Sequence, residues 1–172
     1  MSKKENTPVS VYPMKWYFAL IFALLPISAL SLVFSILSKL TALLQGDYLG
    51  AINANLSKII QPSAFQIILS LLSELSTLAA SVLLIPAWIF LIKKRKTGVK
   101  LYLLSCLIPV ITMPVTITNM FLTSKDLMEG YQEMIDGYLP VIIVFMALIV
   151  AAFVLFYILN RKYFKKRDSY FQ

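Results

Sequence analysis

Four long apolar blocks dominate this chain, and each is 22 residues or longer. They cover residues 16–38, 64–92, 101–122 and 138–159. A helix needs roughly 20 apolar residues to cross the hydrocarbon core of a bilayer. Helices of soluble domains carry a polar face, whereas these blocks are apolar on nearly every side. We therefore expect a single all-α integral membrane domain over residues 1–172, folded as a bundle of four transmembrane helices.

Positive charge is concentrated in three segments. Thirteen of the sixteen Lys and Arg residues lie in the N-terminal tail, in the connection between the second and third spans, and in the C-terminal tail. Four spans place these segments on one side of the membrane. Because Lys- and Arg-rich loops stay in the cytoplasm, we expect both termini inside, at the inner (plasma) membrane. The basic segments then face anionic lipids, and the net charge of +8 does not indicate a nucleic-acid partner.

The connections on the opposite side carry helical patterns. Between residues 47 and 60, apolar side chains recur at spacings of three and four, which predicts a short interfacial helix. Thr123 and Asp126 have the spacing of a capping box, which predicts that a second short helix opens there and ends at Gly137 and Pro140. In the C-terminal tail, cations alternate with aromatic rings, and we expect this tail to lie on an anionic surface.

Small polar side chains recur at helical spacing in the first three spans. They include Ser28, Ser31 and Ser35 in the first, Ser70, Ser73 and Thr77 in the second, and Thr112 and Thr116 in the third. In lipid, helices associate through close packing of small residues and through hydrogen bonds. We expect these three polar seams to face one another, with the fourth helix outside. A water-filled path lined by the same hydroxyls would give the same pattern.

Glu74 is the one acidic residue within the four spans. A carboxylate at the bilayer centre costs roughly 2.5–3.5 kcal/mol on insertion scales, so such groups usually pair or take part in function. At 1.5 Å per residue, Glu74 and Asn119 lie about 28 Å from the basic ends of their spans, and Lys39 about 36 Å along its span. Since a lysine side chain can bend back, we predict a Glu74–Lys39 ion pair with Asn119 nearby. The alternative is a solvated Glu74 in the outer head-group layer.

Residues that carry chemistry are scarce. The chain has no histidine, and Cys106 is its only cysteine. An intramolecular disulfide and a cysteine-based metal site are therefore excluded, and the commonest general base and metal ligand is missing. A single acidic residue in the spans leaves too few groups for acid–base catalysis. We expect no enzymatic activity, no cofactor and no metal.

Short segments at the span ends resemble known membrane proteins. Residues 88–96 (WIFLIKKRK), 99–102 (VKLY) and 163–167 (YFKKR) are similar to the YdgK-like small inner-membrane proteins of bacteria, a family of unknown function. Residues 17–26 (YFALIFALLP) and 103–110 (LLSCLIPV) resemble immunity proteins of pore-forming colicins. Both resemblances imply a four-span protein, and the second also implies both termini inside. Neither transfers a functional residue to this chain.

Two functions fit this pattern. The first is a non-enzymatic multi-pass membrane protein that binds a membrane-protein partner, or itself, in or at the bilayer, as accessory subunits, regulators and immunity factors do. It explains the missing chemistry and the small size. The alternative is an oligomeric transporter or channel for ions or small solutes that uses Glu74.

Overall fold

The computed structural model describes residues 14–59, 61–127 and 132–171, and the regular elements in these ranges are all helical. The first long segment joins α1 (Lys15–Ala19), a π-helical turn (Leu20–Leu24) and α2 (Leu25–Leu44). The others are α4 (Ala64–Ile92), α5 (Lys96–Leu127) and α6 (Gln132–Lys165). Each of these four segments contains an apolar stretch long enough to cross a membrane. The expected all-helical architecture with four candidate spans is therefore confirmed.

The helix bounds agree best with the sequence in the second span, where residues 64–92 coincide with α4. The first helical segment runs six residues beyond the expected end at 38, to Leu44. The prediction that Gly137 and Pro140 end a separate short helix is wrong, because α6 continues through both positions. A proline inside a helix removes one backbone hydrogen bond, and here the helix continues past that loss.

The connection between α2 and α4 and the connection between α5 and α6 differ from each other. Residues 47–60 were expected to form one helix, but the structure has α3 (Tyr48–Ile52), extended backbone at Asn53 and a 3-10 turn at Leu56–Lys58. In the second connection, Thr123 lies inside α5 and does not open a new helix. The expected interfacial helix is thus present, in two pieces, only in the first connection of the described chain. Residues 128–131 of the second connection lie outside the described ranges.

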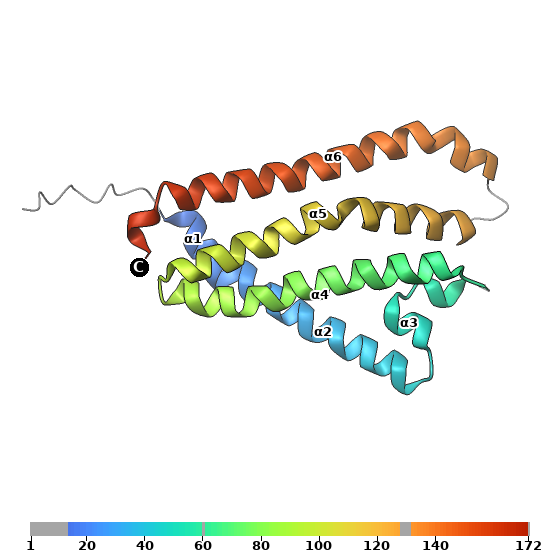
Figure 1. Ribbon diagram of the computed structural model, residues 1–172, viewed down its shortest axis with the longest axis horizontal. Helices are drawn as coiled ribbons and strands as arrows, with labels where there is room; N and C mark the ends of the chain where they lie inside the picture. Colours follow the sequence, from blue (N-terminus) through green and yellow to red (C-terminus); the bar gives the residue numbers. More distant parts are fainter. Residues whose placement is uncertain (1–13, 60, 128–131, 172) are drawn as a thin grey trace, which may run out of the picture.

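The four segments are arranged as a hairpin with a helix on either side (Figure 1). α4 and α5 pack along most of their length, and α6 lies beside α5. α2 diverges from α4 toward the end of the molecule opposite the α4–α5 turn, and α3 lies in the space between these two helices. The start of α1, the α4–α5 turn and the end of α6 share one end of the molecule.

A π-helical turn accommodates Pro26 in the first segment. The backbone N–H of Leu25 bonds to Leu20 O, five residues back, and Pro26 has no N–H to offer. This shift leaves the carbonyl of Ile21 without its usual donor, and the indole N–H of Trp88 on α4 donates to it at 2.8 Å. Freed carbonyls in membrane helices are commonly satisfied by a neighbouring helix in this way. The π-helical turn therefore also provides a hydrogen bond between the first segment and α4.

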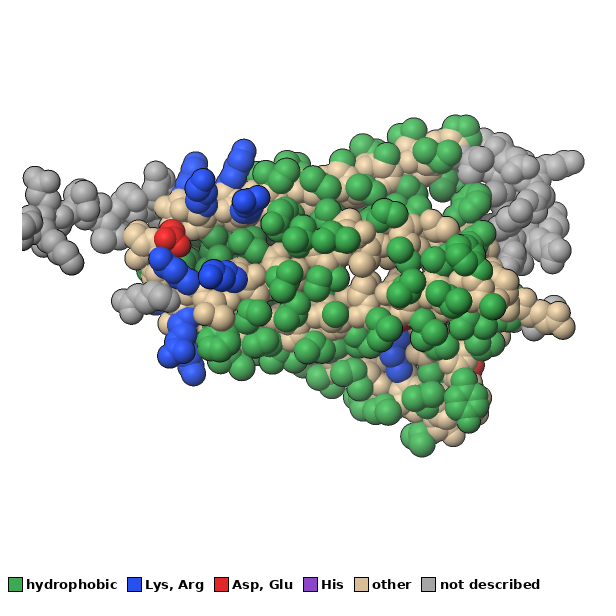
Figure 2. Space-filling view, in the orientation of Figure 1, with side chains coloured by type: hydrophobic (Ala, Val, Ile, Leu, Met, Phe, Trp, Pro, Cys, Tyr) green, Lys and Arg blue, Asp and Glu red, His purple; other side chains and the backbone are tan. Residues whose placement is uncertain are grey.

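The outer surface of the molecule is largely apolar. Many Leu, Ile, Val and Phe side chains on all four long segments are exposed, and Figure 2 shows them along the middle of the molecule. Soluble monomers rarely expose contiguous apolar surface on this scale. Lys and Arg gather at the end that holds the α4–α5 turn, and we call it the basic end. The surface is compatible with contact between the helices and lipid.

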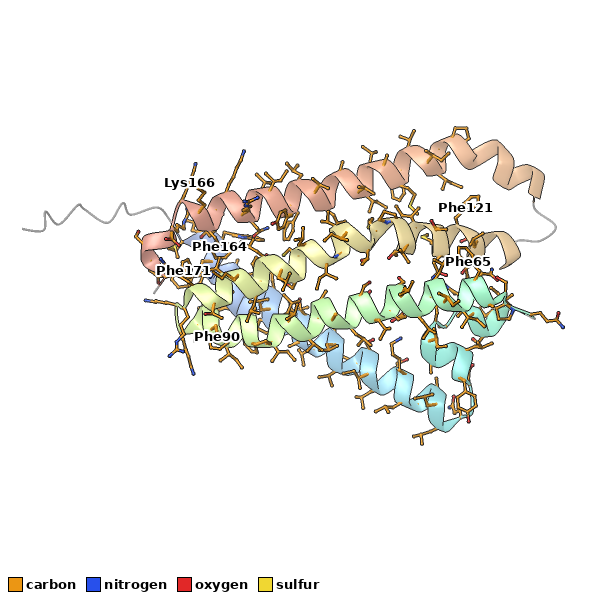
Figure 3. The ribbon with its side chains drawn as sticks, viewed as in Figure 1. Phe65, Phe90, Phe121, Phe164, Lys166 and Phe171 are labelled. Atoms are coloured by element: carbon orange, nitrogen blue, oxygen red, sulfur yellow. The ribbon has the colours of Figure 1, made fainter. Side chains whose placement is uncertain are left out.

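The C-terminal tail folds back onto the basic end. After α6, a 3-10 turn at Asp168–Tyr170 brings Phe171 against the rings of Tyr17 and Phe164, with centroids 5.6 Å apart in each pair (Figure 3). Phe171 is only 3% exposed. Lys96 and Asp168 form a surface ion pair at 3.0 Å. The expectation that the whole tail lies on an anionic surface is wrong for Phe171, because burial against two rings removes its apolar area from water.

Gly98 allows the close approach of α4 and α5 after their short turn. A Cβ atom at this position would lie 2.6 Å from the backbone nitrogen of Leu91 and 2.8 Å from the carbonyl carbon of Phe90. Both atoms belong to the backbone of α4, which cannot rotate away as a side chain could. The first turn of α5 can therefore pack this closely only with glycine at this position.

Replacing Gly98 with alanine is expected to lower the free energy of unfolding by about 1–3 kcal/mol, the usual range for overpacking. Thermal unfolding of the purified protein in detergent measures the change. Thr97→Ala is the matched control, because the neighbouring Thr97 is exposed and its replacement should change stability by less than about 0.5 kcal/mol. Equal melting of the two variants would show that the turn has room for a side chain.

Candidate functional site

Lys39 and Glu74 form an ion pair between α2 and α4. The Lys39 Nζ lies 2.9 Å from Glu74 Oε2, and the two side chains are 23% and 31% exposed. The Glu74–Lys39 ion pair that we predict from distances along the helices is therefore confirmed. The pair gives the one acidic residue of the four apolar spans an opposite charge at hydrogen-bond distance.

The ammonium group of Lys39 also binds α3. It donates to the backbone carbonyls of Ala51 and Ile52, each at 3.3 Å. These carbonyls belong to the last turn of α3, where a helix leaves acceptors unpaired and favours a nearby cation. A lysine has three N–H donors, and three acceptors surround this one. Through these contacts, the Lys39 side chain joins α2 to both α3 and α4.

The two carbonyls were not among the sequence-predicted site residues. Backbone acceptors leave no trace in residue type, so only the position where α3 ends could have indicated them. Asp47 caps the start of α3 by accepting from the N–H of Gly50 at 2.7 Å. A capping aspartate followed by a short apolar stretch was the available signal.

Asn119 lies in a second polar cluster, between α4 and α5. Its side-chain oxygen accepts from the hydroxyl of Ser70 at 2.8 Å, and both residues are buried. One turn further along, the hydroxyls of Ser73 and Thr116 are 3.1 Å apart. Ser70 precedes Glu74 by four residues, so the α4–α5 seam and the ion pair occupy adjacent positions on α4. The hydrogen-bond partner of Asn119 is thus Ser70, one helical turn before Glu74 on α4.

The expected seam on the first segment does not face the other helices. Ser31 and Ser35 are exposed, and the hydroxyl of Ser28 donates to Leu24 O of its own segment at 2.8 Å. The physical reason is the divergence of α2 from α4, which turns this face to the surroundings. The hydroxyls of Thr77 and Thr112 likewise bond to carbonyls of their own helices, those of Ser73 and Ile108, at 3.0 Å. Cross-helix polar contacts of the seam are therefore confined to α4 and α5 in the described chain.

Asn160 is a polar contact point that sequence reasoning missed. Its side-chain oxygen accepts from the indole of Trp16 at 3.0 Å and from the hydroxyl of Tyr102 at 3.2 Å. Its amide donates to Phe156 O at 2.9 Å. One buried amide thus joins α1, α5 and α6 at the basic end. The fourth apolar block of the sequence ends at residue 159, and the amide directly after it is the signal that points to Asn160.

Asn119→Ala is expected to lower the free energy of unfolding by about 1 kcal/mol, because it leaves the buried hydroxyl of Ser70 without this acceptor. Denaturation by SDS in mixed micelles measures the difference. Thr118→Ala is the control, since Thr118 is exposed and its hydroxyl bonds to Pro114 O of its own helix. An Asn119→Ala protein as stable as this control would contradict the role of the seam in packing.

Metal-binding groups do not converge in the described part of the chain. No group of three or more His, Cys, Asp or Glu residues there could hold a metal ion. Cys106 is a free thiol, half-buried within α5. The Lys39–Glu74 pair, the α4–α5 seam and the Asn160 cluster each join polar side chains of different helices, and each consists of groups that bond to one another.

Comparison of the chain with family models, with curated proteins and with solved structures found no match. No residue role is therefore transferred to this chain from another protein. Its function has to be inferred from the geometry of the helices and of the polar groups between them.

Proposed function

We propose that this chain is a small multi-pass protein of the bacterial inner membrane that acts by binding a partner within the bilayer. The partner is another membrane protein or a second copy of this chain, and the role is accessory, regulatory or of the immunity type. The observation that carries the proposal is the packing of α6, which is fixed at one end and open along the rest.

At the basic end, α6 is held by specific contacts. Asn160 bonds to side chains of α1 and α5, and the Tyr163 hydroxyl accepts from the backbone N–H of Tyr17 at 3.1 Å. The ring of Phe164 packs edge-on against Tyr102, with centroids 5.7 Å apart. These contacts fix the position of the helix without using its outer half.

Toward the other end, α6 exposes large apolar side chains. Val141, Val144, Phe145 and Leu148 are each at least 60% exposed. Helices in lipid gain little from hydrophobic burial alone and associate through close packing, so an open face can accept another helix without first losing contacts. The outer half of α6 therefore supports partner binding better than a closed bundle would.

The proposed orientation has both termini in the cytoplasm. The Lys- and Arg-rich segments 93–96 and 161–167 lie together at the basic end, with the start of α1 (Figure 2). Lys- and Arg-rich connections are retained on the cytoplasmic side, which supports this orientation. The Lys39–Glu74 pair would then lie toward the outer side of the membrane.

The alternative of an oligomeric transporter or channel rests on Glu74. Its carboxylate is bound by Lys39, which also holds α3, and this arrangement favours a structural clamp over a group that carries an ion. Purified protein in liposomes distinguishes the two functions. Ion or proton flux that is lost in Glu74→Gln would favour transport, and flux at the level of protein-free liposomes favours partner binding.

Photo-crosslinking in cells tests partner binding directly. A photo-reactive phenylalanine analogue at Phe145 is expected to give a protein adduct of one discrete mass, whose partner mass spectrometry identifies. Phe22 on the first segment is the control position, because it is exposed to a similar degree but lies near the basic end. Equal protein adducts from both positions, or lipid adducts alone from Phe145, would contradict the proposal.

A further inference from the structure

A groove lies between α1 and the last turns of α6. Its volume is about 360 Å³, and it is lined by Trp16, Phe156, Leu159, Asn160 and Tyr163. The volume is at the low end of the roughly 300–1,000 Å³ of small-molecule sites. Phe156 and Leu159 are 42% and 55% exposed, so the groove opens onto the outer surface of the helices. A ligand of this groove therefore enters it from the medium around the helices.

The walls of the groove are held in place by their own polar groups. The indole N–H of Trp16 donates to Asn160, and the Trp16 and Phe156 rings meet edge-on with centroids 6.3 Å apart. The Tyr163 hydroxyl accepts from the N–H of Tyr17. Because these polar atoms are bonded to one another, the groove presents chiefly ring faces and the Leu159 side chain. Such a surface suits a hydrocarbon chain.

Positive charge lies near one end of the groove. The guanidinium of Arg167 lies 3.7 Å from the centroid of the Tyr163 ring and donates to Tyr163 O at 3.1 Å, and Lys15 is the residue before Trp16 in α1. Phe156 lies nine residues before Lys165, where α6 ends, or roughly 14 Å along the helix axis, and Arg167 follows in the turn after it. Positive charge therefore lies at one end of the groove and apolar walls extend from it toward the middle of the span. A phospholipid has this same arrangement, with an anionic head group and acyl chains.

We propose that the groove binds one anionic phospholipid from the leaflet at the basic end. An acyl chain lies against Trp16, Phe156 and Leu159, and the phosphate lies near Arg167 and Lys15. This proposal is more specific than a general attraction of basic segments to anionic lipid, because it assigns one lipid molecule to one groove. It does not depend on the partner-binding function.

Tryptophan quenching by brominated lipids tests the site. The chain has two tryptophans, so Trp88→Phe leaves Trp16 in the groove as reporter, and Trp16→Phe leaves Trp88 on α4 as the control. The proteins are placed in phosphatidylcholine bilayers with a small fraction of brominated phosphatidylglycerol or brominated phosphatidylcholine. At Trp16 we expect phosphatidylglycerol to bind about fivefold more tightly than phosphatidylcholine, the factor one cation near the surface provides. At Trp88 we expect at most about a twofold preference.

Substitutions in the Trp88→Phe background separate the site from diffuse attraction. Arg167→Gln should reduce the preference at Trp16 to about twofold, and Arg167→Lys should retain it, because lysine still attracts phosphate as a point charge. Leu159→Phe narrows the groove without changing charge and should also reduce the preference. Equal preference at both tryptophans, or a preference unchanged in Arg167→Gln and Leu159→Phe, would overturn the proposal.

Native mass spectrometry of the unmodified chain gives a second measurement that needs no tryptophan replacement. From an equimolar mixture of the two lipids, the protein should retain one phosphatidylglycerol in preference to phosphatidylcholine. Arg167→Gln should lose this preference. Retention of several phosphatidylglycerol molecules that does not change in Arg167→Gln would also overturn the single-site proposal.

Discussion

Replacing Lys39 with methionine is expected to lower the free energy of unfolding by about 2–3 kcal/mol. The variant leaves the Glu74 carboxylate and the carbonyls of Ala51 and Ile52 without their shared donor. Removing one partner of a fully buried pair costs about 3–5 kcal/mol, and the partial exposure of both side chains reduces that cost here. SDS titration in mixed micelles measures the difference, and Lys58→Met is the control because Lys58 is exposed in the same outer connection.

A double-mutant cycle separates the ion pair from the anchoring of α3. Glu74→Gln leaves Lys39 with the two carbonyls and should cost less than Lys39→Met. Lys39→Met combined with Glu74→Gln removes both charges, and its cost should fall short of the summed single effects by about 1–3 kcal/mol. If both single variants melt like the wild type and their effects are additive, the contacts of Lys39 with Glu74 and α3 do not stabilise the protein.

The clamp gives Lys39 and Glu74 a structural role that partner binding does not require. It holds α3 between α2 and α4 where these two helices diverge. If the cycle gives the expected coupling while crosslinking from Phe145 is unchanged in Glu74→Gln, the outer clamp and the open face of α6 are independent features. A loss of crosslinking in Glu74→Gln would instead show that the ion pair supports the open face of α6.

Some of this structure could be predicted from local physical chemistry. The bounds of α4 follow from a largely apolar block that ends at a basic cluster, and Ser63 caps its first turn in the structure. The Lys39–Glu74 pair follows from depth, because each helical residue advances by about 1.5 Å and a lone carboxylate in lipid needs a partner. Both inferences use distance along a helix, which sequence spacing determines.

The features that sequence reasoning missed depend on the rotation and direction of the helices. The serines of α2 have the spacing of a packing seam, yet the divergence of α2 leaves Ser31 and Ser35 exposed. Asn119 was expected near the ion pair, and the rotation of α5 directs its side chain to Ser70. The return of Phe171 onto Tyr17 depends on a turn after α6. Such relations are set by packing between helices, which a single sequence does not specify.

Phe171→Ala is expected to lower the free energy of unfolding by about 3 kcal/mol, at the lower limit of the usual range for a buried phenylalanine. The ring of Phe171 is 3% exposed and contacts the rings of Tyr17, Phe164 and Tyr170. Its removal opens a cavity where α1, α6 and the tail meet. Thermal unfolding in detergent measures the loss, and Phe22→Ala is the control because that ring is 74% exposed.

The same measurement shows what holds the tail in place. Asp168→Asn breaks the ion pair with Lys96. The side chains of Lys96 and Asp168 are 49% and 68% exposed, so this variant should lower the free energy of unfolding by less than about 1 kcal/mol. A large loss in Phe171→Ala with a small loss in Asp168→Asn means that ring burial fastens the tail. The opposite order would mean that charge holds it, and raised salt would then release the tail because exposed ion pairs are screened.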